Sequence, residues 1–420
     1  LHVITGRTLD SAPCFYLASE YSNYLFNVPE LTQKQLMANF SRLPSFKGIF
    51  ITSLYPDSIG GLSHLGLQYL RRKVSIPFSA PENFKEVILC KTNYVSYEFD
   101  AENLNQYIDN DIQLEKIVLS NSVSYKILLK RIQKTILILD VRSLDDISQL
   151  PPISEFSTII HFTNPEILLK SEYTEFFSGK INLCFMNSGI ISNQIGLDYY
   201  QQRSNSFLQP LCTGPTLQAP DGFINLTTSH LSYNFIKEAV MIKKQHEEIP
   251  LSNIDIKLPI FPQLIHNEPK IPEFDIYAVT FLGCGTKFVA PHLHLSGYLI
   301  HTKYGIIALD PSEGFVYQLR RKYGPINANN ILTNLCCIWL SHFHHDHIFG
   351  SASLLFERKK VTDKQIYFCA PQPVINDIKI ISQHYGDFNV VYDNREVNGE
   401  IPEDPLSITD QIHTLQINDH

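Results

Sequence analysis

Apolar residues along this chain fall into short runs that alternate with amphipathic stretches. Runs rich in Val, Ile, Leu, Phe and Tyr at 2–6, 15–28 and 48–52 predict β-strands, and the stretch at 30–40 predicts a helix. The same order of strands and one helix recurs later, at 276–286, 296–310, 313–324 and 336–341. Strands that alternate with helices predict an α/β fold.

The two parts of the chain also share sequence. When residues 49–61 are laid over 338–350, an offset of 289, IFIT meets IWLS and IGG meets IFG. Further on, FSAP at 78–81 meets FCAP at 368–371, an offset of 290. Two matches at nearly one offset predict a duplication.

A proline-rich stretch lies between the copies. Residues 247–274 carry five prolines, a density that resists regular structure and is typical of a linker. We therefore expect a first copy at 1–244, a linker at 245–272 and a second copy at 273–420.

Composition indicates a globular protein and narrows its surroundings. Of 420 residues, 44% are apolar and 18% are charged, which allows two or three domains with a sizeable core. The net charge of −8 argues against a protein that coats nucleic acid with its whole surface. Four small basic clusters are either solvated helix ends or phosphate contacts: 71–73, 130–131, 320–322 and 358–360.

The spacing of the cysteines and the length of the apolar runs indicate where in the cell the protein is expected. Eight scattered cysteines without a CxxC pair favour reduced thiols and an intracellular protein. No apolar run reaches the roughly 18 residues that a membrane span needs, so no membrane partner is expected. The chain begins at Leu1 without an initiator Met or a signal-like leader, so we expect it to be the interior of a longer protein, in which an N-terminal targeting segment could precede this sequence.

Candidate chemistry gathers in residues 342–347, where four histidines and Asp346 follow an apolar run. Extended backbone sends alternate side chains to one side, so His342 and His344 are expected to face one point. With a helix beginning near Ile348, Asp346 and His347 would project from the bend.

Imidazole and carboxylate groups are suitable ligands for zinc and similar ions. The number of donors exceeds what one tetrahedral ion takes and favours an ion pair, which suits phosphodiester hydrolysis. Asp346 is expected to ligate, to accept a proton from the attacking water, or both. His345 is not expected to be a ligand. In the first copy Ser53, Tyr55 and Ser58 replace His342, His344 and His347, so that copy is expected to lack metal.

These motifs resemble a known family. HxHxDH after an apolar strand is the signature of the metallo-β-lactamase fold, an αββα sandwich. FLGCGT at 281–286, IIALDPSEGFVYQLRRKYG at 306–324 and IWLSHFHHDHIFGSASLLFER at 338–358 are similar to the catalytic half of ribonuclease Z. Residues 6–30 and 48–67 resemble the amino-terminal half of its long form, which has lost its metal ligands.

The resemblance implies a zinc-dependent endoribonuclease that removes 3′ trailers from precursor tRNA by metal-hydroxide attack on a phosphodiester. It implies two zinc ions, one bound by His342 and His344 and the other by Asp346 and His347, with Asp346 as the catalytic proton acceptor. Asp310 would support a ligand histidine or simply cap a helix. We expect a monomer that works in the nucleus, the mitochondrion or both.

The chain departs from the family pattern in three places. His420 is the candidate for a further ligand, and the last two ligands have no counterpart, so the second copy is expected to be truncated. The family's PxKxRN element falls near 289–296, where Pro291 and Leu293 replace its lysine and arginine. His292 and His294 there are interpreted as exposed loop residues. No Gly-Pro-rich arm is found between Phe99 and Lys134.

Two other functions remain open. The first is a different zinc hydrolase of this fold, such as a glyoxalase-type thioesterase, although a silent first copy is not expected there. The second is a catalytically inactive RNA-binding or scaffold protein, because half of the metal site lacks ligands in the sequence.

Overall fold

The computed structural model describes residues 1–8, 10–39, 44–71, 76–87, 103–187, 217–226, 231–242, 278–285 and 294–394. The strands form three sheets, two from residues 2–242 and one from residues 278–394. We call these two parts the first half and the second half. The predicted linker at 245–272 lies outside the described residues and stays a prediction. No helix within the described ranges has the length and apolar character needed to cross a membrane.

The first sheet has seven strands in the order β14-β13-β1-β2-β3-β4-β5. Strands β3, β4 and β5 are parallel, and the other neighbours are antiparallel. The bounds are β1 His2–Thr5, β2 Cys14–Ala18, β3 Asn23–Phe26, β4 Gly48–Phe50, β5 Phe78–Ser79, β13 Leu231–Asn234 and β14 Ala239–Ile242.

The second sheet also has seven strands, in the order β12-β11-β10-β9-β8-β7-β6. Strands β9 to β12 are parallel, and β6 to β9 are antiparallel. The bounds are β6 Gln106–Ile108, β7 Ile112–Val118, β8 Val123–Leu129, β9 Lys134–Leu139, β10 Thr158–His161, β11 Ile181–Cys184 and β12 Phe223–Asn225.

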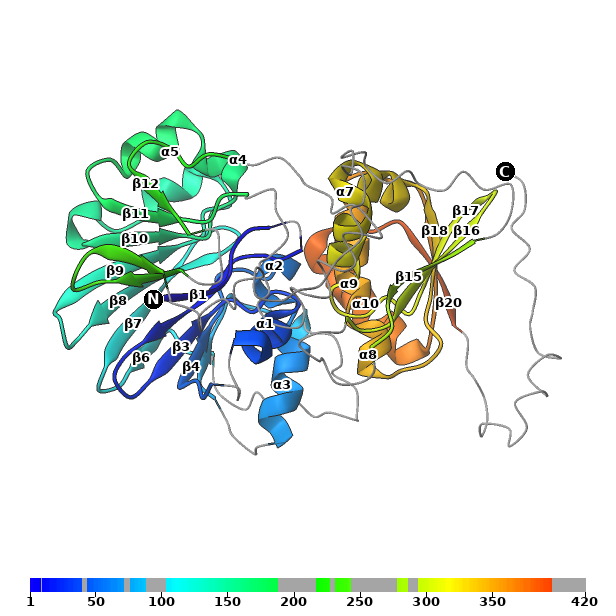
Figure 1. Cartoon of the computed structure of the whole chain (residues 1–420), viewed down its shortest axis with the longest axis horizontal. Helices are drawn as coiled ribbons and strands as arrows, with labels where there is room; N and C mark the ends of the chain where they lie inside the picture. Colours follow the sequence, from blue (N-terminus) through cyan, green and yellow to red (C-terminus); the bar gives the residue numbers. More distant parts are fainter. Residues whose placement is uncertain are drawn as a thin grey trace, which may run out of the picture.

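The two sheets pack face to face, with helices on both outer sides (Figure 1). Phe15 and Phe26 of the first sheet share an apolar core with Tyr125 and Ile138 of the second. Helices cover the outer faces through separate cores. The bounds are α1 Thr32–Asn39, α2 Pro56–Ile59, α3 Leu62–Arg71, α4 Pro165–Leu168 and α5 Ser171–Phe176, with 3-10 turns at Phe84–Glu86, Leu144–Gln149 and Ile153–Glu155. The first half is therefore a four-layer αββα sandwich.

The second half has one six-stranded sheet, β15-β16-β17-β18-β19-β20, in the described residues. Its helices pack on one face around a single core, and α7 and α9 lie between this sheet and the first half (Figure 1). The strands are β15 Ala278–Gly283, β16 Gly297–Thr302, β17 Gly305–Leu309, β18 Leu335–Trp339, β19 Ile366–Ala370 and β20 Val390–Asn394. The helices are α7 Phe315–Thr333, α8 His345–Ile348, α9 Ser351–Lys359 and α10 Gln372–Tyr385.

Helix α7 continues past Gly324, where the sequence predicts its end. Gly324 has a φ of 75° and precedes Pro325, which disfavours helical backbone in the residue before it. The helix therefore kinks there and resumes.

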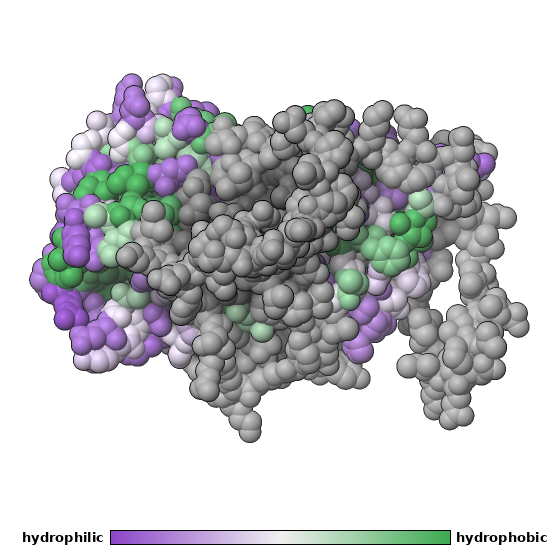
Figure 2. Space-filling model, in the orientation of Figure 1, coloured by the Kyte–Doolittle hydropathy of each residue, from purple (hydrophilic) through white to green (hydrophobic). Residues whose placement is uncertain are grey.

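The other face of the third sheet carries exposed apolar side chains. Val279, Phe281 and Tyr367 are 54%, 64% and 40% exposed. Apolar residues are visible on the right of the molecule, where β15 lies (Figure 2). In an αββα sandwich this is the face that a second sheet covers.

Candidate metal centre

Two neighbouring parallel strands bring the candidate ligands together. Strands β17 and β18 pair in parallel, so their carboxyl ends lie at one edge of the sheet. Asp310 directly follows β17, and the histidine-rich stretch 341–347 directly follows β18. The sheet therefore places Asp310 beside residues that are about thirty positions away along the chain.

The helix after the histidines begins earlier than predicted. Helix α8 starts at His345 instead of near Ile348, so Asp346 and His347 lie on its single turn. The turn ends because Gly350 passes close to the Asp310 loop and donates its N–H to the carbonyl of Pro311 at 3.0 Å. A Cβ at Gly350 would lie 2.0 Å from the carbonyl oxygen of Ser312, so the crossing requires glycine.

The three histidine rings are in contact. Nε2 of His342 lies 2.8 Å from Nδ1 of His344, and the rings of His342 and His347 are 4.3 Å apart. Nε2 of His347 lies 3.6 Å from Oδ2 of Asp346. His342 and His344 are exposed, whereas Asp346 is buried. The predicted ligands therefore form one cluster at the protein surface.

Asp310 supports this cluster from below. One carboxylate oxygen accepts the Ser341 N–H at 2.7 Å, and the other accepts the Ser341 hydroxyl at 2.7 Å. The second oxygen also lies 2.9 Å from Nδ1 of His347. Asp310 does not cap the following helix, because the N-cap of α7 is Gly314. The contact with His347 places Asp310 beside a candidate ligand, and its supporting role stays a prediction.

The pKa shifts follow from these contacts. Burial alone would raise the pKa of Asp310, but hydrogen bonds from His347 and Ser341 hold it below its usual value. The hydrogen bond to Asp310 raises the pKa of His347, which is partly opposed by burial. Burial, together with the neighbouring His347 and His344, lowers the pKa of His342. The cluster thus contains imidazoles of unequal basicity above an ionised Asp310 carboxylate.

The imidazole nitrogens and carboxylate oxygens of this cluster are donors that bind divalent cations, but they are not arranged around a single point. Among the described residues, no three His, Cys, Asp or Glu side chains form a metal-binding group. Two nitrogens on one tetrahedral zinc, each at about 2.0–2.1 Å, stand roughly 3.3 Å apart. The distance of 2.8 Å between Nε2 of His342 and Nδ1 of His344 is shorter than this, and a small movement of the rings would bring the two nitrogens to that spacing. His420 lies outside the described residues, so its role stays a prediction.

The first half repeats the geometry below the cluster without the ligands. Asn27 follows β3 as Asp310 follows β17, and both have positive φ, 57° and 46°. The side-chain oxygen Oδ1 of Asn27 accepts the Thr52 N–H at 2.8 Å, as the Asp310 carboxylate does from Ser341. Gly61 donates to the carbonyl of Val28 as Gly350 donates to that of Pro311. Thr52 and Gly61 thus keep the offset of 289 in space, whereas Asn27 and Val28 match residues 283 positions later.

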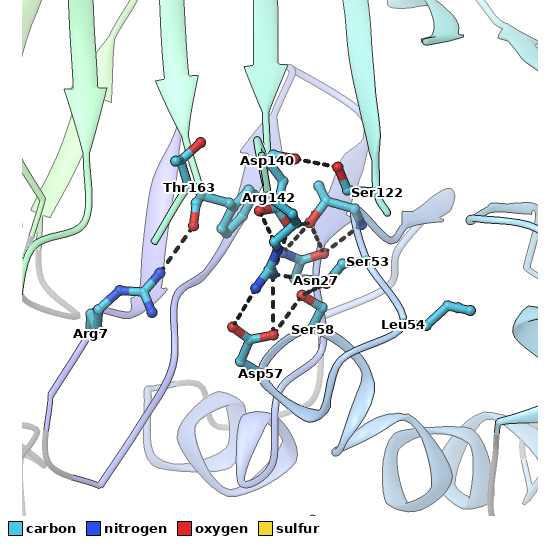
Figure 3. Close-up of polar contacts among 12 residues, drawn as sticks. Arg7, Asn27, Ser53, Leu54, Asp57, Ser58, Ser122, Asp140, Arg142 and Thr163 are labelled. Atoms are coloured by element: carbon cyan, nitrogen blue, oxygen red, sulfur yellow. Dashed lines mark hydrogen bonds and ion pairs between the residues drawn. The ribbon is translucent and has the colours of Figure 1, made fainter. Parts of the chain in front are cut away.

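A guanidinium occupies the place that faces the ligand positions of the first half. Arg142 lies between Asp140 and Asp57, with Ser53 and Ser58 beside it (Figure 3). Its Nε and Nη2 each lie 2.8 Å from Asp140, and Nη2 donates to the Ser53 hydroxyl at 2.9 Å. Asp57 contacts it at 3.4 Å. An internal cation thus balances these carboxylates.

Charge explains the stability of this arrangement. Burial opposes the charge on Arg142, but Asp140 and Asp57 raise the pKa of the guanidinium above its ordinary value. Burial likewise would raise the pKa of Asp57, and Arg142, Arg7 and Lys360 lower it. Sequence reasoning missed Arg142, because it lies far along the chain from Asp57. The available signal in the sequence was Arg142 itself, a charged residue two positions after Asp140 at the end of an apolar strand.

The interpretation of His294 as an exposed loop residue is wrong. Its Nε2 lies 2.8 Å from Nζ of Lys34 in the first half and accepts from Arg321 at 3.0 Å. Gln318 lies 2.6 Å from its Nδ1. Burial and the two cations lower its pKa well below the usual value, so the ring is neutral. The packing of the two halves against each other, which the sequence does not reveal, encloses it. His292 lies outside the described residues.

Comparisons with known proteins give one consistent family. Residues 2–61 match a family model for the tRNase Z endonuclease. A mitochondrial tRNase Z of Arabidopsis thaliana is 33% identical over 105 residues, which is 24% of this chain and 12% of the relative. A mitochondrial ribonuclease Z of Drosophila melanogaster is 30% identical over 142 residues, which is 33% of this chain and 18% of the relative. The matched segments thus span less than a fifth of these relatives.

The structural comparison covers almost the whole chain. A long-form RNase Z from yeast aligns with 94% of this chain and 73% of its own, with a TM-score of 0.68 and 15% sequence identity. At that identity the likeness establishes the fold alone. The predicted fold class, an α/β fold of the metallo-β-lactamase type, is confirmed. The predicted truncation of the second copy stays a prediction.

Proposed function

We propose, from the premise that this chain is a relative of the long-form tRNase Z enzymes in the metallo-β-lactamase superfamily, that it is a zinc-dependent endoribonuclease. Its substrate would be precursor tRNA, from which it removes the 3′ trailer. The observation that carries this proposal is the cluster of His342, His344, Asp346 and His347 after β18, beside Asp310 at the end of the parallel strand β17. The names of the relatives support the reaction and the substrate.

Each residue of the cluster has a distinct task in this proposal. His342 and His344 would hold one ion, and Asp346 and His347 the other. Bound zinc would supply a nucleophile from water at neutral pH and neutralise charge on the phosphate. Asp310 keeps the ring of His347 oriented through Nδ1, which leaves Nε2 directed toward Asp346. Asp346 would accept the proton at its carboxylate, which is buried beside the exposed histidines.

The proposal also includes the division of the chain into two copies of the fold. The first copy at 1–244 would be a fold without ligands, and the second copy at 273–420 would carry the catalysis. The repeated loop geometry around Asn27 and Asp310 supports a duplication. The guanidinium of Arg142 supports a first copy that needs no metal. A monomer would then contain both copies.

Substrate binding would depend on phosphate contacts and RNA shape. Because the net charge of the chain is −8, local groups of basic residues would have to attract the RNA. Binding should therefore weaken steeply as the salt concentration rises. The mitochondrion is the proposed location, because two relatives carry that word in their names. The nucleus stays a prediction of the sequence.

The test compares matched positions of the two copies. The complete polypeptide, with any residues that follow His420, is compared with its His342→Ala, Asp346→Ala and Ser53→Ala variants. Each is loaded with zinc and assayed on a precursor tRNA with a 3′ trailer. We expect cleavage by the wild type and by Ser53→Ala, and at least a ~100-fold loss in the other two. About two zinc ions per chain are expected in the wild type.

Two outcomes would favour the other functions. Hydrolysis of a glutathione thioester without trailer cleavage would indicate a glyoxalase-type thioesterase. Well under one zinc per chain, together with RNA binding and no cleavage, would indicate an inactive RNA-binding protein. Trailer removal that persists in Asp346→Ala would contradict the assigned site.

A further inference from the structure

We propose that His64, in the first half, is a positioning residue for the metal centre of the second half. This inference rests on the function proposed above. His64 lies in the first turn of α3 and is 3% exposed. Its imidazole contacts both segments that carry the candidate ligands and their support, although it belongs to the other copy.

The first contact fixes the loop of Asp310. Nδ1 of His64 bonds to one carboxylate oxygen of Glu313. The second oxygen accepts the backbone N–H of Leu31, also from the first half, at 2.5 Å. Glu313 is only three residues beyond Asp310 and its side chain is 1% exposed. A carboxylate held at both oxygens by the first half restrains the loop that orients His347.

The second contact fixes the end of helix α8. The ring of His64 meets the ring of Phe349 edge to face, with centroids 4.8 Å apart. Phe349 is two residues beyond His347 and is itself buried. One imidazole therefore braces the loop below His347 and the helix that carries it. Movement of either segment would change the distance between Asp310 and His347.

The duplication shows that the aromatic contact of this brace is specific to the second half. Glu30 and Glu313 occupy equivalent places, and each accepts an N–H from the other half: Gly314 donates to Glu30 at 3.2 Å. At the offset of 289, the counterpart of His64 is Ser353, which hydrogen-bonds to Glu30. The counterpart of Phe349 is Gly60, which has no ring. A serine hydroxyl cannot span a carboxylate and an aromatic ring at once. The imidazole thus supports the copy that keeps the histidines.

The experiment uses three variants of the full-length chain. His64→Ala removes both contacts, and His64→Asn keeps a donor at the place of Nδ1. His161→Ala is the control, because His161 is a buried histidine on β10 of the first half that bonds to Tyr173 of α5 and Asn182 of β11. Cobalt binding is followed by visible absorbance, and amide exchange at 341–347 is measured without metal.

We expect His64→Ala to bind cobalt about 10–100-fold more weakly, the usual effect of losing a group that supports a metal ligand. Exchange at 341–347 should be faster, and trailer cleavage should lose kcat with KM within about twofold. His64→Asn should recover part of each loss. His161→Ala should unfold more easily yet keep wild-type cobalt affinity and exchange at 341–347.

The outcomes separate this inference from the proposed function. A wild type that binds cobalt but leaves the trailer intact contradicts the function, and the affinities still test His64. Equal cobalt affinity or equal exchange at 341–347 in His64→Ala and the wild type overturns the inference. So does a loss of the same size in His161→Ala, since that would be a general effect of instability.

Discussion

Replacement of Arg142 tests whether a guanidinium holds the first half together where the second half would hold metal. Arg142→Met keeps most of the aliphatic volume and removes the charge. It leaves Asp140, which is fully buried, without the two contacts at 2.8 Å. The remaining hydrogen bond to Asp140, from the Thr52 hydroxyl at 2.7 Å, cannot neutralise the carboxylate.

The magnitude follows from the burial of each partner. Removing one partner of a buried ion pair costs about 3–5 kcal/mol. Asp57 adds little, because its side chain is 30% exposed and its contacts are at 3.4 Å. We therefore expect Arg142→Met to lose about 3 kcal/mol, nearly all of it through Asp140. The double variant Arg142→Met/Asp140→Asn removes the unpaired charge and should recover at least about half of that loss.

Urea unfolding can assign the loss to the first half. The single tryptophan, Trp339, lies in β18, so its fluorescence reports the second half, whereas circular dichroism reports both. Arg131→Met is the matched control, because the Arg131 side chain is 74% exposed in a surface pair with Glu20. That control should lose less than about 1 kcal/mol.

Two results would refute the reasoning. A loss below about 1 kcal/mol in Arg142→Met would show that Asp140 is not stabilised by the guanidinium. A double variant no more stable than the single one would show that the loss comes from packing instead of charge.

Two further predictions concern carboxylates near the metal centre and the junction of the halves. Asp310→Asn keeps an acceptor for Ser341 but loses the charge beside His347. The zinc affinity measured by calorimetry should therefore fall about tenfold or more, and an unchanged affinity would contradict the supporting role. Burial, and to a lesser extent the neighbouring Glu313, raise the pKa of Glu30 to about 8. Glu30 is thus protonated in the folded chain and ionised in the unfolded chain between about pH 4.5 and 8, so stability falls as pH rises through that window. Glu30→Gln should remove this dependence and stabilise the chain at pH 8 by about 2 kcal/mol in urea unfolding, and an unchanged slope between pH 5 and 8 would refute it.

Local sequence was sufficient for the outline of the fold and for the ligand cluster. The alternation of apolar runs predicted strands such as β4 and β18, because side-chain periodicity depends on neighbouring residues. His342, His344, Asp346 and His347 had to be close in space, since only six positions contain them. The start of α8 was predicted three residues late, and its end was not predicted, because a crossing with the distant Asp310 loop ends the turn at Gly350.

What the sequence determined by itself was the duplication, the α/β class and the presence of metal-type donors in one copy only. The tertiary structure decided which distant groups meet: Asp310 below His347, Arg142 between Asp140 and Asp57, and His64 against Glu313 and Phe349. Contacts of this kind depend on strand order and on how two halves pack. Neither is encoded by spacing along the chain, because residues hundreds of positions apart become neighbours only after the sheets and helices have assembled.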